Sequence, residues 1–251
     1  MAKLLHFEFH KLIRQKSFYI CLAVAVAMLV VSTCTTYLIN KDVMDTAEMG
    51  IDAMNVMIGS ASGGVLSMVI GVFIPLFACE DYVSGTIRNI VTRGYSRLGI
   101  FSAKLIAVML ATAVMTIACM AAGYLIGLIF SGSGVEPFDA ATVKILLCQL
   151  AVMLAEGALF YAISTVLQKT GGSIAVCLVL PMVLTIVLTL ADTALAEKDI
   201  SLSAYWLERI SGTLSSFDVK SADMKKALLT ALGYFVVTSA GSFLAVMKRE
   251  Y

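Results

Sequence analysis

Six long apolar stretches are the feature of this sequence that most constrains its fold. A helix needs about 20 mainly apolar residues to cross the hydrocarbon core of a bilayer. Of the 251 residues, 60% are hydrophobic and 14% are charged, whereas about 25% charged residues are typical of soluble domains. The sequence therefore predicts an all-α polytopic membrane protein, with one transmembrane domain over residues 1–251. The predicted spans are residues 18–39, 57–79, 99–130, 143–166, 172–192 and 227–247.

The distribution of lysine and arginine predicts how the spans are oriented. Basic residues close to the ends of spans mark the cytoplasmic side of a membrane. They are more numerous on the side that holds residues 1–16 and the loop 80–104 than on the other side. With an even number of spans, both termini are predicted to be cytoplasmic.

Residues 1–16 have an amphipathic helical pattern. Four apolar residues share one face, and most of the basic residues and both histidines occupy the other. Such a helix is expected to lie along the membrane surface and to contact membrane lipids. The apolar positions are Leu5, Phe9, Leu12 and Ile13.

Residues 193–226 form the longest segment on the predicted outer side. Within it, Leu202, Trp206, Ile210 and Leu214 recur every four residues. This spacing predicts one or two short helices at the outer interface of the membrane, with Trp206 as the anchor.

Two glycine pairs at four-residue spacing mark expected helix contacts. The first pair, Gly59 and Gly63, opens the second span, and the second pair, Gly123 and Gly127, lies in the third. Small residues at this spacing let two helices approach closely in a membrane.

Familiar catalytic and cofactor-binding patterns are absent from the sequence. It contains no HExxH and no GxxxxGK[ST], so it has no phosphate-binding loop for ATP. The six cysteines have no CxxC spacing, which argues against a zinc site or a disulfide framework. A net charge of +1 does not suit a nucleic-acid-binding protein. We therefore predict a protein that is not an enzyme and that binds no metal, cofactor or nucleic acid itself.

Glu156 is the one ionisable residue in the middle of a predicted span. An ionisable residue at this depth is a candidate functional site, because its burial in lipid is costly. The alternative is a glutamate that only fixes helix packing, hydrogen-bonded to Gln149 or to a hydroxyl of a neighbouring span. The sequence leaves both interpretations open.

The loop between the second and third spans, residues 80–104, is polar and basic and contains a short helical pattern. Ser84 is the predicted N-cap and Gly94 the predicted stop of a surface helix. This helix would either offer polar groups to a partner outside the bilayer or only set the topology. The apolar positions are Ile87, Ile90 and Val91, and the polar positions on the opposite arc are Thr86, Arg88, Asn89, Thr92 and Arg93.

The loop resembles the ABC-2 family of transporter permeases. The shared pattern is an acidic residue, then Ser-Gly-Thr-Ile, then Ser-Arg, then a lysine. The opening stretch LLHFEFHKLIRQKSFYI is similar to the connecting helix that begins chains of this family. The matching loop positions are Glu80, Ser84, Gly85, Thr86, Ile87, Ser96, Arg97 and Lys104.

The resemblance implies a permease subunit that pairs with a second copy or homologue and with separate ABC ATPase subunits. ATP and Mg²⁺ would be bound by the ATPase, not by this chain. Residues 84–94 would be the coupling helix that contacts the ATPase, with residues 1–16 as the connecting helix beside it. The residues assigned to ATPase coupling are Glu80, Asp81, Ser84, Gly85, Thr86, Ile87, Arg88, Ile90, Val91, Arg93 and Arg97.

The predicted function is that of an export permease in a bacterial plasma membrane. Chain length and loop style resemble bacterial exporters of amphipathic peptides, such as phenol-soluble modulins and lantibiotics, so the expected cargo is an amphipathic peptide or another hydrophobic molecule. One alternative is an ion-coupled secondary transporter or channel that uses Glu156. The other is an immunity protein that transports nothing and binds a toxic peptide at residues 193–226.

Overall fold

The computed structural model describes residues 2–43, 53–62, 64–92, 94–130, 140–195, 201–215, 219 and 221–247. All regular elements in these ranges are helices. They are α1 (Ala2–Arg14), α2 (Lys16–Val43), α3 (Ala53–Ser60), α4 (Val65–Val83), α5 (Thr86–Thr92), α6 (Arg97–Phe130), α7 (Ala140–Leu167), α8 (Thr170–Ala194), the 3-10 helix η2 (Ser203–Tyr205), α9 (Leu207–Leu214) and α10 (Ser221–Met247).

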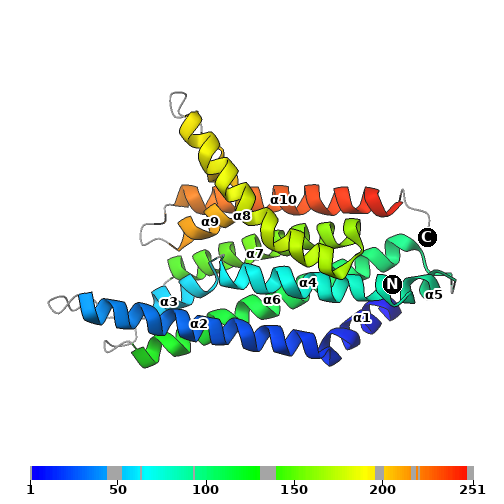
Figure 1. The fold of residues 1–251 in the computed structure, drawn as a ribbon, viewed down its shortest axis with the longest axis horizontal. Coiled ribbons are helices and arrows are strands. Elements are labelled where there is room, and N and C mark those ends of the chain that lie inside the picture. Colours follow the sequence, from blue (N-terminus) through cyan, green and yellow to red (C-terminus); the bar gives the residue numbers. More distant parts are fainter. Residues whose placement is uncertain are drawn as a thin grey trace.

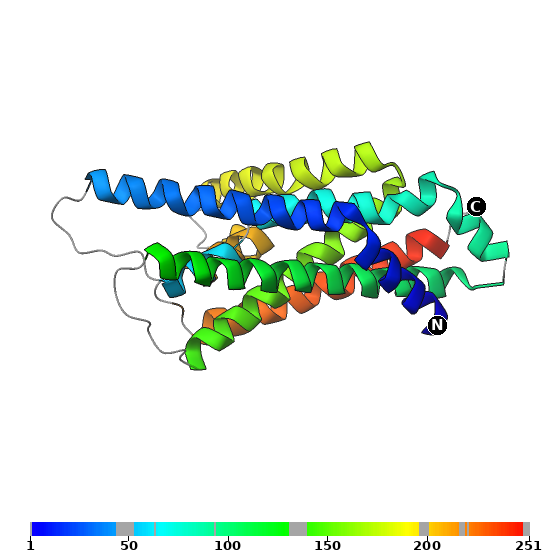
Figure 2. The same ribbon diagram turned by 90° about the horizontal axis from the view of Figure 1, so that it is seen from below.

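The long helices form an elongated bundle. Within the described ranges, six segments are long and apolar enough to cross a membrane, one for each predicted span. The fold prediction of an all-α polytopic membrane protein is therefore confirmed. Helices α1 and α5 lie at one end of the bundle, and α3 and α9 lie toward the other (Figures 1 and 2). We refer to these as the α5 end and the α9 end.

The second span is two helices rather than one. Helix α3 ends at Ser60 and α4 begins at Val65, and Gly64 between them has φ 63°. Only glycine adopts this left-handed conformation at little cost. The run of small residues from Gly59 to Gly64 therefore breaks the helix that the sequence predicted as continuous.

Helix α3 packs closely against α6 at the second predicted glycine pair. A Cβ added to Gly127 would lie 2.6 Å from the Cα of Ala53, and one added to Gly123 would lie 2.7 Å from the Oγ of Ser60. The contact predicted for Gly123 and Gly127 is therefore confirmed. Gly59 differs, since no described atom lies within 4 Å of an added Cβ, and Gly63 is outside the described residues.

Helix α4 forms the centre of the bundle. Phe73, Ile74 and Phe77 are completely buried in the main apolar core. Helices α8 and α10 instead leave most of their apolar side chains exposed, which suits surfaces that face lipid. The central position of α4 matters because its last turns hold the charged residues described next.

Candidate functional site

Three helices meet at the carboxylate of Asp81 at the α5 end. Asp81 lies in the last turns of α4 and is 4% exposed. Lys11 of α1 places Nζ 2.5 Å from its Oδ1. Lys104 of α6, itself buried, forms an ion pair with Oδ2 and donates a second hydrogen bond to the carbonyl oxygen of Ala78, 3.3 Å away. Asp81 thus ties α1, α4 and α6 together.

Glu80 and an aromatic ring complete this cluster. The Nζ of Lys11 lies 3.0 Å from Oε2 of Glu80, whose side chain is half exposed. The ammonium groups of Lys11 and Lys104 lie 5.5 and 5.9 Å from the centre of the Phe77 ring, within the range of a cation–π interaction. We call Lys11, Glu80, Asp81 and Lys104 the ionic joint.

The charges of the ionic joint depend on one another. Burial by itself lowers the pKa of Lys11, but the hydrogen bonds and charges of Asp81 and Glu80 outweigh it and raise that pKa above 10.5, so Lys11 stays charged. Removing one partner of a buried ion pair leaves an uncompensated charge, at a cost of about 3–5 kcal/mol. The buried members of the joint, Asp81 and Lys104, therefore depend on each other for stability.

Glu8 of α1 is buried close to the joint. Its side chain is 1% exposed, and its Oε2 has no hydrogen-bond partner among the described residues. Burial raises its pKa above 4.5, and the negative charges of Asp81 and Glu80 act in the same direction, while Lys104 and Lys11 oppose them. The environment of Glu8 favours the neutral carboxylic acid.

Helix α1 packs on the protein through a face that shares only one residue with the predicted apolar stripe. Leu4, Glu8 and Leu12 are buried at four-residue spacing, whereas Leu5, Phe9 and Ile13 are exposed. Of the predicted apolar stripe, only Leu12 packs into the core. The physical reason is that the ionic joint holds the Glu8 and Lys11 side of α1 inward, which leaves the other apolar residues free for the membrane surface.

Helix α5 is held against this assembly by its apolar side. Ile87 is 7% exposed. Ile90 packs against a buried cluster formed by Leu4 of α1 with Ile100 and Ala103 of α6. Ile87 and Ile90, two apolar positions of the predicted helical pattern, thus lie on the side of α5 that faces the protein.

The ends of α5 differ in part from the prediction. The helix covers Thr86–Thr92 rather than residues 84–94. Ser84 is the C-cap of α4, not the N-cap of α5, because its backbone N–H donates to the carbonyl of Glu80 and Gly85 follows with φ 71°. The hydroxyls of Ser84 and Thr86 are 2.8 Å apart. Gly94, with φ 86°, has the left-handed conformation expected after a helix.

The structure thus brings part of the predicted set together. Glu80 and Asp81 lie in the ionic joint, and Ser84, Gly85, Thr86, Ile87 and Ile90 form the turn and the inward side of α5. Arg93 and the side chains of Arg88, Val91 and Arg97 lie outside the described residues. Sequence reasoning missed Lys11 and Glu8 as members of the site, and it named Lys104 only as a position of the family pattern. Lys104 carried a usable signal, since a lysine within an apolar span needs a partner.

Glu156 lies in α7 and is 4% exposed. The hydroxyl of Ser67 on α4 donates a hydrogen bond to its Oε1. Gln149, the other predicted partner, instead donates to the carbonyl of Ile58, 3.0 Å away, and to Oγ of Ser215, 3.2 Å away. The pair of Glu156 and Ser67 agrees with the packing interpretation and joins two central helices.

Helix α9 packs against the spanning helices, whereas the sequence predicted a short helix at the outer interface of the membrane. Leu207, Ile210 and Leu214 are buried against α7 and α10. Trp206, expected as an interfacial anchor, is 5% exposed, and its indole N–H donates to Oγ1 of Thr185 at 3.0 Å. The expected four-residue stripe accounts for this burial, because an apolar face satisfies a protein core as well as an interface.

The fold and the ionic joint together define a multi-pass membrane protein with a helix of the N-terminal segment and a loop helix docked at one end. The chain matches the family described as ABC-2 family transporter protein over residues 4–192. The matched range contains the ionic joint, α5 and Glu156 and stops before α9. A comparison with curated proteins found no match. Since the match covers most of the chain, the protein belongs to the ABC-2 transporter family.

Proposed function

We propose that this chain is the permease subunit of an ABC exporter and that α5 receives work from a separate ATPase subunit. The ATPase would bind ATP and Mg²⁺, and this chain would provide the path through the membrane. The supporting observation is the arrangement of α5 directly on the ionic joint. Only Ser84 and Gly85 separate α5 from α4, and Asp81 in the last turns of α4 is paired with both α1 and α6.

This arrangement suits mechanical coupling. A force on α5 reaches α4 through a two-residue turn and reaches α1 and α6 through Ile90 and its apolar neighbours. Packed helices move as units when an interface between them changes. ATP-driven closure of the ATPase would then displace three helices together.

The proposed cargo is an amphipathic peptide or another hydrophobic molecule. The spans are apolar, and small hydroxyl groups such as those of Ser67, Thr185 and Thr189, which hydrogen-bond within the protein, are the main polar groups along the spanning parts of α4 and α8. We also propose a dimer with a second permease copy or homologue in a bacterial plasma membrane. The exposed apolar faces of α2 and α8 offer a surface for such a subunit.

The first experiment isolates the tagged chain from its native membrane and measures bound ATPase and ATP hydrolysis. We expect an ABC ATPase to co-isolate with the wild type. Arg88→Asp, on the predicted outward arc of α5, should lose it, and Lys169→Asp, a matched control in the exposed connection between α7 and α8, should retain it. ATP hydrolysis by the chain alone, or equal recovery of the ATPase with both variants, would contradict the proposal.

The second experiment tests the cargo. Inside-out vesicles with the complex should accumulate a fluorescent amphipathic helical peptide only when ATP is present. Accumulation driven by an ion gradient without ATP, and abolished by Glu156→Gln, would instead support the ion-coupled alternative.

A further inference from the structure

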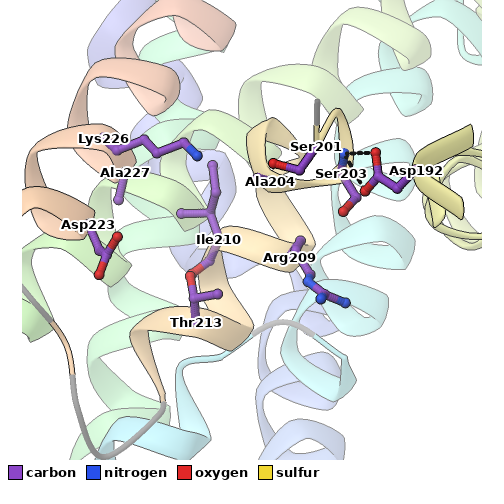
Figure 3. A pocket seen from close by; sticks show the side chains of 10 residues that line it. All are labelled: Asp192, Ser201, Ser203, Ala204, Arg209, Ile210, Thr213, Asp223, Lys226 and Ala227. Carbon is purple, nitrogen blue, oxygen red and sulfur yellow. Dashed lines mark hydrogen bonds between the residues drawn. The ribbon is translucent and has the colours of Figure 1, made fainter. Parts of the chain in front are cut away.

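A pocket at the α9 end is lined by residues of α8, α9 and α10. There α8 leans away from α10 (Figure 1), and α9 lies between them (Figure 2). The pocket encloses about 440 Å³. Ile210 of α9 lies in the middle of it, with Asp223 and Lys226 of α10 on one side and Asp192 of α8 on the other (Figure 3). Arg209 and Ser203 complete the main polar lining.

The described residues that line this pocket include two acidic and two basic side chains, and none of the four forms an ion pair with another. Two carboxylates, from Asp192 and Asp223, line it together with the cations of Arg209 and Lys226. Among the described residues, every ion pair lies in the ionic joint at the other end. Lys226 places its ammonium 4.3 Å from the centre of the Tyr205 ring, a contact that leaves the N–H donors on the far side from the ring available.

The carboxylate of Asp192, one of these four charged groups, already accepts hydrogen bonds from the backbone. Oδ1 of Asp192 accepts a hydrogen bond from the backbone N–H of Leu202 at 2.6 Å, and Oδ2 accepts one from the N–H of Ser203 at 3.2 Å. These bonds hold η2 against the end of α8. Arg209 lies on the same side of Ile210 as Asp192, so Asp223 and Lys226 on the other side remain as the pair that can recognise a ligand (Figure 3).

The mixture of charges identifies the kind of ligand. Arginine and lysine bind phosphate oxygens strongly, and a carboxylate binds an ammonium group. Asp223 and Lys226 offer one charge of each sign, and such a pair suits a zwitterion better than an anion.

The position of the pocket indicates where this zwitterion comes from. Asp192 lies in the last turn of α8, and Asp223 and Lys226 lie in the first two turns of α10. Ends of spanning helices lie at the level of lipid headgroups. Along α10, Leu229 and Val237 follow Lys226 on the same helical face and are 77% and 71% exposed, so an apolar surface leads from the pocket into the membrane.

We propose that this pocket binds a zwitterionic phospholipid. Its phosphate contacts Lys226, its ammonium group contacts Asp223, and one acyl chain lies along Leu229 and Val237 of α10. The site does not depend on which side of the membrane holds the α9 end, since both leaflets contain phospholipid. It is also independent of the proposed coupling to an ATPase.

The test is native mass spectrometry of the purified full chain, titrated with dihexanoylphosphatidylethanolamine or dihexanoylphosphatidylglycerol. The ethanolamine lipid should bind more tightly than the glycerol lipid. Lys226→Gln should weaken its binding about tenfold, as expected for the loss of one charged hydrogen bond. The matched control Lys225→Gln changes the neighbouring exposed lysine, which does not line the pocket, and should bind as the wild type does.

A second variant separates headgroup recognition from general attraction to lipid. Asp223→Asn should remove the preference for ethanolamine over glycerol while the phosphate contacts remain. Equal affinities of Lys226→Gln and Lys225→Gln, or equal binding of the two lipids to the wild type, would overturn the proposal. So would a zwitterionic dipeptide that binds as tightly as the ethanolamine lipid, because the pocket would then recognise peptide termini.

Discussion

The two ends of the bundle use charged side chains in opposite ways. At the α5 end, Lys11 and Lys104 form ion pairs with Asp81, and both Asp81 and Lys104 are buried. At the α9 end, Arg209 and Lys226 line an open pocket and have no ion-pair partner among the described residues.

The difference teaches what each end is suited to do. Charged side chains that form ion pairs with one another hold their helices in a fixed arrangement. Such helices move together, but the paired charges are not free to bind a ligand. Charges without partners remain hydrated and available, which favours recognition. The end with the ionic joint therefore fits mechanical coupling, and the end with the pocket fits binding.

The largest expected effect comes from breaking the ionic joint. Asp81→Ala removes the shared carboxylate and leaves the buried ammonium of Lys104 without an ion-pair partner among the described residues. We expect a loss of about 3–5 kcal/mol in the free energy of unfolding. Denaturant-induced unfolding of the purified chain in detergent measures it.

Glu80→Ala is the matched control for Asp81→Ala. Glu80 is adjacent in sequence and pairs with the same lysine, but its side chain is half exposed. The cost should stay below about 1 kcal/mol, as for surface ion pairs. Similar losses for the two variants would show that the joint does not act as a buried unit.

Close helix contact near the α9 end gives the next effect. Gly127→Ala places a methyl group 2.6 Å from the Cα of Ala53, so α3 and α6 must move apart. We expect a destabilisation of about 1–3 kcal/mol, measured by the same unfolding assay. Gly233→Ala in α10, where no described atom lies within 4 Å of the new Cβ, should not destabilise the chain, because alanine favours helix; destabilisation by both changes would contradict the packing account.

A polar pair between the two ends gives a comparable or smaller effect. Ser67→Ala removes the hydroxyl that donates to Glu156 and leaves a buried carboxyl group without that partner. The expected cost is about 1–3 kcal/mol. Glu156→Gln keeps an oxygen acceptor for Ser67 and should cost less; if it cost more than Ser67→Ala and also abolished transport, Glu156 would have a role beyond packing.

The smallest expected effect is a pH dependence that arises at Glu8. Because burial raises its pKa above 4.5, its contribution to stability is full below about pH 4.5 and is lost as the pH rises through the pKa of the folded state. Glu8→Gln resembles the protonated form and should gain stability relative to the wild type between about pH 4 and pH 8. Melting temperatures across this range measure the difference.

Glu80→Gln serves as the control for this pH series, since Glu80 is half exposed. Its difference from the wild type should change less with pH than that of Glu8→Gln. A flat difference for Glu8→Gln would mean that burial does not hold Glu8 in its neutral form.

Much of the fold was predictable, because span length and apolar content are set by the bilayer itself. All six spans were found, and helical spacing grouped Ile87 and Ile90, which lie on the side of α5 that faces the protein. The break at Gly64 was missed because hydropathy averages over a short turn.

The ionic joint was only partly predictable. Glu80 and Lys104 were named through the family pattern and Asp81 as a neighbour of the coupling helix, but the pattern did not show that Asp81 pairs with Lys104 and with the distant Lys11. Helical periodicity identified the apolar residues of α1. It could not show that the side of α1 with Glu8 and Lys11 faces the protein, because that orientation depends on the ion pair between Lys11 and Asp81. Pairings between distant charges appear only once the helices are placed.

The central claim is that α5 contacts an ATPase, and cysteine cross-linking tests it most directly. Thr92→Cys at the exposed end of α5 and Lys169→Cys in the exposed connection between α7 and α8 are compared in the native membrane with a short bifunctional maleimide. The account predicts a cross-link from residue 92 to an ABC ATPase that changes in yield when ATP is added, and none from residue 169. An ATPase that cross-links to residue 169 but never to residue 92 would contradict it.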